Sequence, residues 1–145
     1  MRRLVPLQDT GNGRTGFNIC GLIFDGMDIE SILLVKSACN AAVSILIDQA
    51  GIAARDLRRV YVTGSMGIHF QASDLVQIGF FPEECQGRIV PVGNAVIQGL
   101  WAYTNDPIRW KNWFESFASR SRAVDMTAVG DFTDRFTAGM SLGFV

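Results

Sequence analysis

The segment from Asp28 to Gly51 constrains the fold of this chain most strongly. Its apolar residues recur at helical spacing, so one mainly apolar face runs for about six turns. Asp28 is expected to cap the N-terminus, because its carboxylate can accept from the free N–H groups of the first turn. Gly51 favours the left-handed conformation that ends helices, and Ile52 can close an apolar C-terminal contact. The expected face consists of Ile29, Ile32, Leu33, Lys36, Cys39, Val43, Leu46, Ile47 and Ala50.

Composition indicates one compact domain over residues 1–145. The chain is 48% apolar and 19% charged, which excludes a disordered tail. Thirteen Lys and Arg against 14 Asp and Glu give a formal charge of −1, so no overall positive field favours nucleic acid. We see no apolar run near the roughly 20 residues of a membrane helix, and no signal peptide. We therefore expect a cytoplasmic protein with neither a membrane nor a nucleic-acid partner.

Residues that commonly hold metals or catalyse reactions are few. Cys20, Cys39 and Cys85 are far apart, and His69 is the one histidine. We therefore expect three reduced thiols and no metal site built from this chain. Ser65 precedes His69 by four residues, but no elbow motif or third partner accompanies the pair. We assign no catalytic residue.

The rest of the chain alternates between strand and helix patterns. Strands are expected at 3–7, 16–24, 59–63, 88–92 and 123–127, with a turn at 9–14. Helices are expected at 73–78, 94–103, 106–120 and 131–140. Such alternation predicts an α/β fold with at least part of the sheet parallel.

Two of the expected strands end in glycines. Val60–Val62 leads into Thr63-Gly64-Ser65-Met66-Gly67, and Val90–Val92 leads into Gly93-Asn94. Ligands of open α/β sheets bind at the carboxyl ends of strands, where glycines let the backbone approach closely. Glycines also end strands for steric reasons alone, so each loop fits either a phosphate or nucleotide site or an ordinary turn.

Aromatic residues concentrate in the expected helix over 106–120 and just before it. Their helical spacing fits a core or a contact surface for another domain, and a binding platform is the alternative. The group consists of Trp101, Trp110, Trp113 and Phe114.

Several segments together resemble one family. They are Asp28-Ile29, Val35-Lys36-Ser37-Ala38, Gly51-Ile52, Val60–Gly67, Ile78–Pro82 and Ile89–Ala95. In this order they look like the C-terminal part of the reductive activators of corrinoid proteins. These are ATP-dependent enzymes that return cob(II)alamin to cob(I)alamin on methyl-transferring corrinoid proteins. The resemblance runs from about Leu7 to the C-terminus.

The resemblance implies a ribonuclease-H-like lobe of the acetate/sugar kinase, heat-shock protein and actin superfamily, with a mixed sheet and helices on both faces. It places the adenosine motif on Gly64, Ser65, Met66 and Gly67. The preceding helix would lend Lys36, Ser37 and Asn40 to the adenine and ribose of ATP, which binds with Mg. The segment from Gly93 to Gly99 resembles the second connecting helix at the hinge between lobes.

The resemblance also implies partners that this chain does not contain. Complete activators carry a [2Fe–2S] ferredoxin-like domain held by four cysteines, and their second lobe grips the phosphates. We therefore expect a C-terminal nucleotide-binding lobe, inactive alone, that works with the missing lobe, the ferredoxin domain and a corrinoid protein. The alternatives are a non-catalytic module of the same fold, forming a homodimer or docking through 106–120, and a lobe of a sugar- or acyl-kinase relative.

Overall fold

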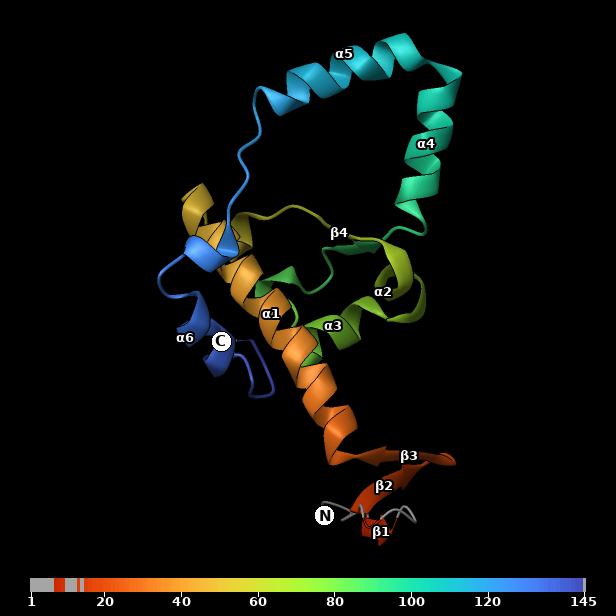
Figure 1. Cartoon of the computed structure of the whole chain (residues 1–145), viewed down its shortest axis with the longest axis vertical. Coiled ribbons are helices and arrows are strands. Elements are labelled where there is room, and N and C mark those ends of the chain that lie inside the picture. The colour runs from red at the N-terminus through yellow and green to blue at the C-terminus, as the bar shows by residue number, and fades with distance from the viewer. Residues whose placement is uncertain (1–6, 10–12, 14, 145) are drawn as a thin grey trace.

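The computed structural model describes residues 7–9, 13 and 15–144 (Figure 1). Its central element is helix α1, Gly26–Ala50. A three-stranded antiparallel sheet lies at the N-terminal end of α1 and consists of β1 (Leu7–Asp9), β2 (Thr15–Ile19) and β3 (Leu22–Asp25). The expected strand at 3–7 and turn at 9–14 fall mostly outside the described residues. The expected strand at 16–24 is instead two strands, because Cys20 and Gly21 adopt positive φ angles of 54° and 85° and turn the chain.

Both ends of α1 are capped, but the N-cap residue differs from the one expected from the sequence. The N-cap is Asp25 rather than Asp28, because the Asp25 carboxylate accepts from the N–H groups of Met27 and Asp28. Asp28 completes a capping box by accepting from the Asp25 N–H at 3.1 Å. Gly51 ends the helix in the left-handed conformation at φ 65°, as predicted.

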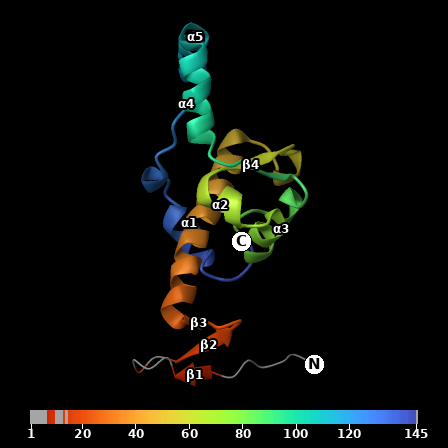
Figure 2. The same ribbon diagram turned by 90° about the vertical axis from the view of Figure 1, so that its right-hand side faces the viewer.

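A βαβ unit packs on one side of α1. Strands β4 (Val60–Val62) and β5 (Ile89–Pro91) pair in parallel, and α2 (Gly64–His69), α3 (Ala72–Ile78) and two short 3₁₀ turns, η1 (Ala54–Asp56) and η2 (Glu83–Cys85), surround them. Figure 2 shows this unit beside α1 from a second direction. Its buried core consists of Val62, Leu75, Val76, Phe80, Cys85 and Ile89.

The C-terminal half adds an arm and a closing helix. The helices α4 (Ala95–Asn105) and α5 (Pro107–Ala118) form an arch beyond the C-terminal end of α1 (Figure 1). We refer to these two helices as the arm. After the 3₁₀ turn η3 (Met126–Ala128), α6 (Phe132–Ala138) packs on α1. The helices expected at 73–78, 94–103, 106–120 and 131–140 are thus confirmed within a few residues.

The prediction of a single mixed sheet is wrong. The described residues form a mixed α/β structure with two small separate sheets, one antiparallel and one parallel. The 25 residues of α1 span about 37 Å and hold β3 far from β4. No strand forms at 123–127, because the Asp125 carboxylate accepts from the Thr127 N–H at 3.0 Å and its hydroxyl at 2.7 Å. These local bonds favour the turn η3 over a strand ladder.

The expected apolar face of α1 is also partly wrong. Ile29, Ile32 and Leu46 are 41%, 46% and 47% exposed. The buried residues of α1 are Lys36, Ser37, Asn40, Ala41 and Ile45. The sequence was expected to contain no segment long and apolar enough to cross a membrane. By length and composition alone, α1 is such a segment. A core helix of a soluble protein passes the same test, and α1 contacts both α6 and β3.

Candidate functional site

The two glycine-ended strands bring their loops together. Because β4 and β5 are parallel, their carboxyl ends meet at one edge. There the Thr63 hydroxyl donates to the Gly93 carbonyl at 2.8 Å and accepts from the Ala95 N–H at 3.2 Å. The Gly64 N–H donates to the same Gly93 carbonyl at 3.3 Å. Sequence reasoning predicted each loop separately, and the structure joins them into one hydrogen-bonded edge.

Two glycines in the first loop are required for different reasons. Gly64 has a φ angle of +75° and open space where a side chain would stand. Glycine is therefore needed here because other residues rarely adopt a positive φ angle. At Gly67 a Cβ atom would clash with the Val62 carbonyl oxygen. Glycine is therefore needed here because the backbone of β4 lies too close for any side chain. The segment after Gly64 is the short helix α2 rather than an open loop. The backbone turn is therefore fixed before any ligand arrives.

An apolar pocket of about 350 Å³ lies between this loop and α1. Its volume is at the lower end for small-molecule sites, and nearly all of its lining surface is apolar. Met66 reaches it from α2, and Ser31, Ile32 and Val35 reach it from α1. The full lining is Ser31, Ile32, Val35, Met66, Phe70, Ile78 and Phe80. Of the seven predicted nucleotide-binding residues, Met66 is the one that lines this pocket.

The predicted contacts on α1 lie elsewhere in this structure. Lys36 is 0% exposed, and its Nζ donates to the carbonyls of Gly139 at 2.8 Å, Ser141 at 2.7 Å and Gly143. Burial lowers the pKa of Lys36. The lysine therefore fastens the segment 139–144 that follows α6, which we call the C-terminal segment.

Ser37 and Asn40 are buried on α1 together with Lys36. The Asn40 Nδ2 donates to the Gly79 carbonyl at 3.2 Å. The Ser37 hydroxyl and the Asn40 Oδ1 are buried with no hydrogen-bond partner among the described residues. At about 100° of helical rotation per residue, Lys36, Asn40 and Ser37 are turned by roughly 90°, 130° and 170° from the centre of the face of α1 that lines the apolar pocket, so this buried face points away from the pocket. The seven predicted residues thus divide between the glycine loop and this buried face.

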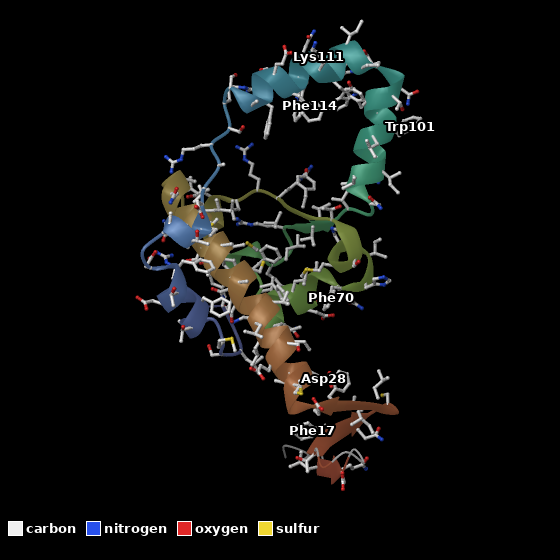
Figure 3. All side chains as sticks on the ribbon, in the orientation of Figure 1. Phe17, Asp28, Phe70, Trp101, Lys111 and Phe114 are labelled. Carbon is white, nitrogen blue, oxygen red and sulfur yellow. The ribbon has the colours of Figure 1, made fainter. Side chains whose placement is uncertain are left out.

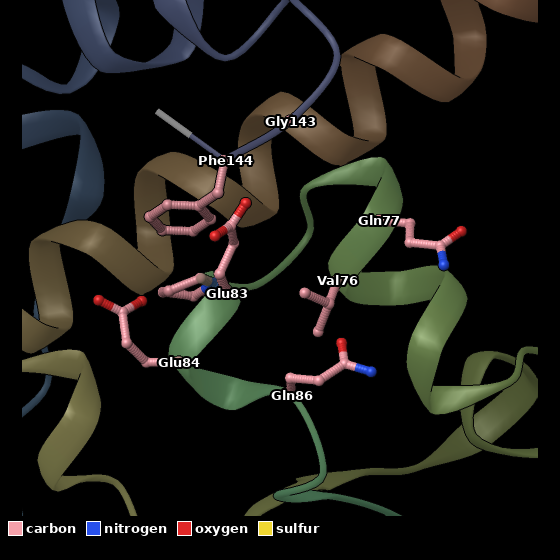
Figure 4. A pocket seen from close by; sticks show the side chains of 8 residues that line it. Val76, Gln77, Glu83, Glu84, Gln86, Gly143 and Phe144 are labelled. Atoms are coloured by element: carbon pink, nitrogen blue, oxygen red, sulfur yellow. The ribbon is translucent and has the colours of Figure 1, made fainter.

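A larger cavity of about 860 Å³ lies between α3, η2 and the C-terminal segment (Figure 4). Its lining includes Glu83 and Glu84 together with Gln77, Gln86 and the Phe144 ring. Two carboxylates repel a polyphosphate, so this cavity is unsuited to a nucleotide despite its size. The smaller apolar pocket beside the glycine loop is the better candidate.

The thiols and acidic groups form no metal centre in the part of the chain that the structure describes. No three His, Cys, Asp or Glu side chains come together there. Cys20 is exposed, Cys39 is half-buried and Cys85 is buried. Burial raises the pKa of the Cys39 and Cys85 thiols, which makes them poor nucleophiles at neutral pH.

The family model for the C-terminal domain of RACo, the ASKHA domain, matches residues 11–143. The chain belongs to this family. The resemblance to the C-terminal part of the corrinoid-protein activators is thereby confirmed. The match covers α1, both glycine loops and the arm of this RACo domain. A comparison with curated proteins finds no match.

Sequence reasoning missed most of the pocket in this RACo domain. The sequence pattern places Ile32 on the expected apolar stripe of α1, Phe80 enters only as part of the family-like segment Ile78–Pro82, and Phe70 carries no signal of its own. One signal did point to an unusual helix face: Lys36 falls within an otherwise apolar stripe. A lysine in such a position is more often a buried, hydrogen-bonded group than a ligand contact.

Proposed function

We propose that this chain supplies the adenosine-binding side of an ATP site in a reductive activator of corrinoid proteins. The observation that carries the proposal is the joined edge at Thr63, Gly64 and Gly93 beside an apolar pocket. A base would enter the pocket against Met66 and Val35, and the ribose would lie along the backbone of Gly64 and Ser65. The chain would form one ribonuclease-H-like lobe and act in the cytoplasm.

The residues present fit the apolar part of a nucleotide better than its phosphates. The first turn of α4 is already occupied, because Asn94 Oδ1 accepts from the Ile97 N–H at 3.1 Å and Thr63 accepts from Ala95. The pocket lining itself contains no charged side chain. We therefore assign the phosphates and Mg to the second lobe, which the [2Fe–2S] domain and the corrinoid protein would accompany. ATP hydrolysis would then favour one arrangement of the partners through differential binding.

A pair of tryptophan variants on α1 tests the proposal. Val35→Trp would place a large ring at the pocket, whereas Ile29→Trp changes an exposed residue of the same helix outside the lining. We expect the wild-type chain and Ile29→Trp to bind Mg-ATP with millimolar affinity in calorimetry, and Val35→Trp to bind at least tenfold more weakly. Equal affinities in all three proteins would refute the assignment of the base to this pocket.

One observation favours a second function, a docking module. Neither α4 nor α5 contains a buried residue, and Trp101 is 72% exposed. The core position, one of the two arrangements that the helical spacing fits, is therefore wrong for these aromatic residues, and a contact surface for another domain or a binding platform remains. A homodimer is one such arrangement. Sedimentation equilibrium decides that question: a concentration-independent monomer mass with intact Mg-ATP binding would exclude the dimer.

A further inference from the structure

Five exposed arginines gather where α1 ends and β4 begins. One group lies on the segment that joins α1 to β4, and the other on the segment that descends from α5 to the same end of α1 (Figure 1). Arg122 fastens the descending segment to α1, because its guanidinium donates to the side-chain oxygen of Gln49 near the end of that helix at 2.5 Å. We call this group the arginine surface: Arg55, Arg58, Arg59, Arg120 and Arg122.

None of the five lies within ion-pair distance of a carboxylate in the part of the chain that the structure describes. Two nearby acidic groups have other partners. Asp48 pairs with Arg135 at 2.7 Å, and Asp56 accepts from the Ala53 N–H at 2.9 Å. Since the whole chain has a formal charge of only −1, the positive charge is local to this end of the molecule.

Exposed aromatic rings adjoin the arginine surface. Arg59 donates to the hydroxyl of Tyr61 at 3.5 Å, and Tyr61 is 61% exposed. On α5, the Trp113 ring stacks on Phe117 with centroids 5.1 Å apart, and the Arg120 side chain donates to the carbonyl of Ser116, the residue before Phe117, at 3.0 Å. Figure 3 labels Phe114 and Lys111 on α5; they are three residues apart and therefore neighbours on the helix surface. Arg, Tyr and Trp are the residues most enriched among protein-binding hot spots.

We propose that the arginine surface and the adjoining rings of α5 bind an acidic surface on the protein that the activator reduces. This inference rests on the proposed function, because the corrinoid protein is the partner named there. Charge complementarity supplies the orientation and speed of association, while the rings supply buried apolar area. The aromatic content and the near-neutral overall charge favour a protein partner over nucleic acid.

Two pairs of charge-changing substitutions test the proposal. Arg58→Glu/Arg59→Glu alters the arginine surface, and Gln8→Glu/Gln77→Glu adds negative charge at exposed positions outside both that surface and α5. Binding of a purified corrinoid protein to the 145-residue chain is measured by biolayer interferometry at 50 and 300 mM salt. We expect wild-type affinity to fall at high salt, the first variant to bind at least tenfold more weakly, and the second to stay within threefold of wild type.

The possible results distinguish a failure of this inference from a failure of the proposed function on which it rests. Equal binding by wild type and Arg58→Glu/Arg59→Glu overturns the arginine surface alone. No binding of the corrinoid protein by the wild-type chain, with or without Mg-ATP, overturns the inference, whereas the adenosine-binding role is tested separately by Mg-ATP calorimetry. Tighter binding of a 20-base DNA duplex than of the corrinoid protein also overturns the inference. If the Glu variant melts early, Arg58→Gln/Arg59→Gln removes the same charges with less perturbation, and it is expected to weaken binding as well.

Discussion

Replacing Lys36 with methionine tests how the C-terminal segment is held. The side chain is 0% exposed and donates to three backbone carbonyls. Methionine fills a similar volume but donates nothing. Hydrogen bonds to charged groups contribute about 1.5–3 kcal/mol each. The contact with Gly139 is buried, whereas those with Ser141 and Gly143 are part-buried, so water can partly replace the latter two.

The lowered pKa of Lys36 limits the size of the effect. Burial disfavours the ammonium, and methionine avoids that cost, so the loss falls well below the sum of three bonds. We therefore expect Lys36→Met to lower the free energy of unfolding by about 2–4 kcal/mol. For a chain of this size the melting temperature should fall by about 5–15 °C. Exposed Lys111 provides the control, and Lys111→Met should stay within about 0.5 kcal/mol of wild type.

Chemical denaturation and amide exchange provide the assay. Exchange at the C-terminal segment should accelerate in Lys36→Met but not in Lys111→Met, because only Lys36 binds its carbonyls. A melting temperature within 2 °C of wild type, together with unchanged exchange at Gly139 and Gly143, would refute the reasoning.

Three further predictions follow from pKa shifts, close contacts and burial. Because burial lowers the pKa of Lys36, the unfolded chain keeps the Lys36 proton to higher pH than the folded chain does. The free energy of unfolding of the wild type, relative to that of Lys36→Met, should therefore rise as the pH increases toward 10.5. A decrease over this pH range would contradict the prediction. Gly67→Ala places a Cβ against the Val62 carbonyl and should lower the melting temperature clearly, whereas Gly99→Ala, in open space within α4, should raise stability by about 0.5–1 kcal/mol. Exposed Cys20 should react with a thiol reagent at once at pH 8, and buried Cys85 only after denaturant is added; simultaneous reaction of both would contradict the burial.

Local sequence signals predicted most helices and strands, but not their arrangement. Gly51, Gly79 and Pro107 stand at helix boundaries because each suits the backbone conformation there. The strand expected around Asp125 failed because a local side-chain bond competes with a ladder. The length of α1 likewise separates two sheets that the alternation of elements had suggested were one.

The candidate site was predicted in part for a similar reason. The Gly64 and Gly93 loops carry their signal in consecutive residues, so sequence reasoning found them. The position of Lys36 depends on Gly139 and Gly143, more than 100 residues away, and no local pattern encodes such a contact. The pocket around Met66 likewise joins α1, α2 and α3, which only the tertiary structure brings together.

The most direct test of the adenosine-binding role is an NMR titration of the isotope-labelled chain with Mg-ATP. The account predicts saturable chemical-shift changes at the amides of Gly64, Ser65 and Gly67 and at the methyl group of Met66, even at millimolar affinity. Val35→Trp should abolish these shifts and Ile29→Trp should preserve them. Flat signals at the loop up to 10 mM Mg-ATP, or shifts confined to Glu83 and Glu84 at the acidic cavity, would contradict it.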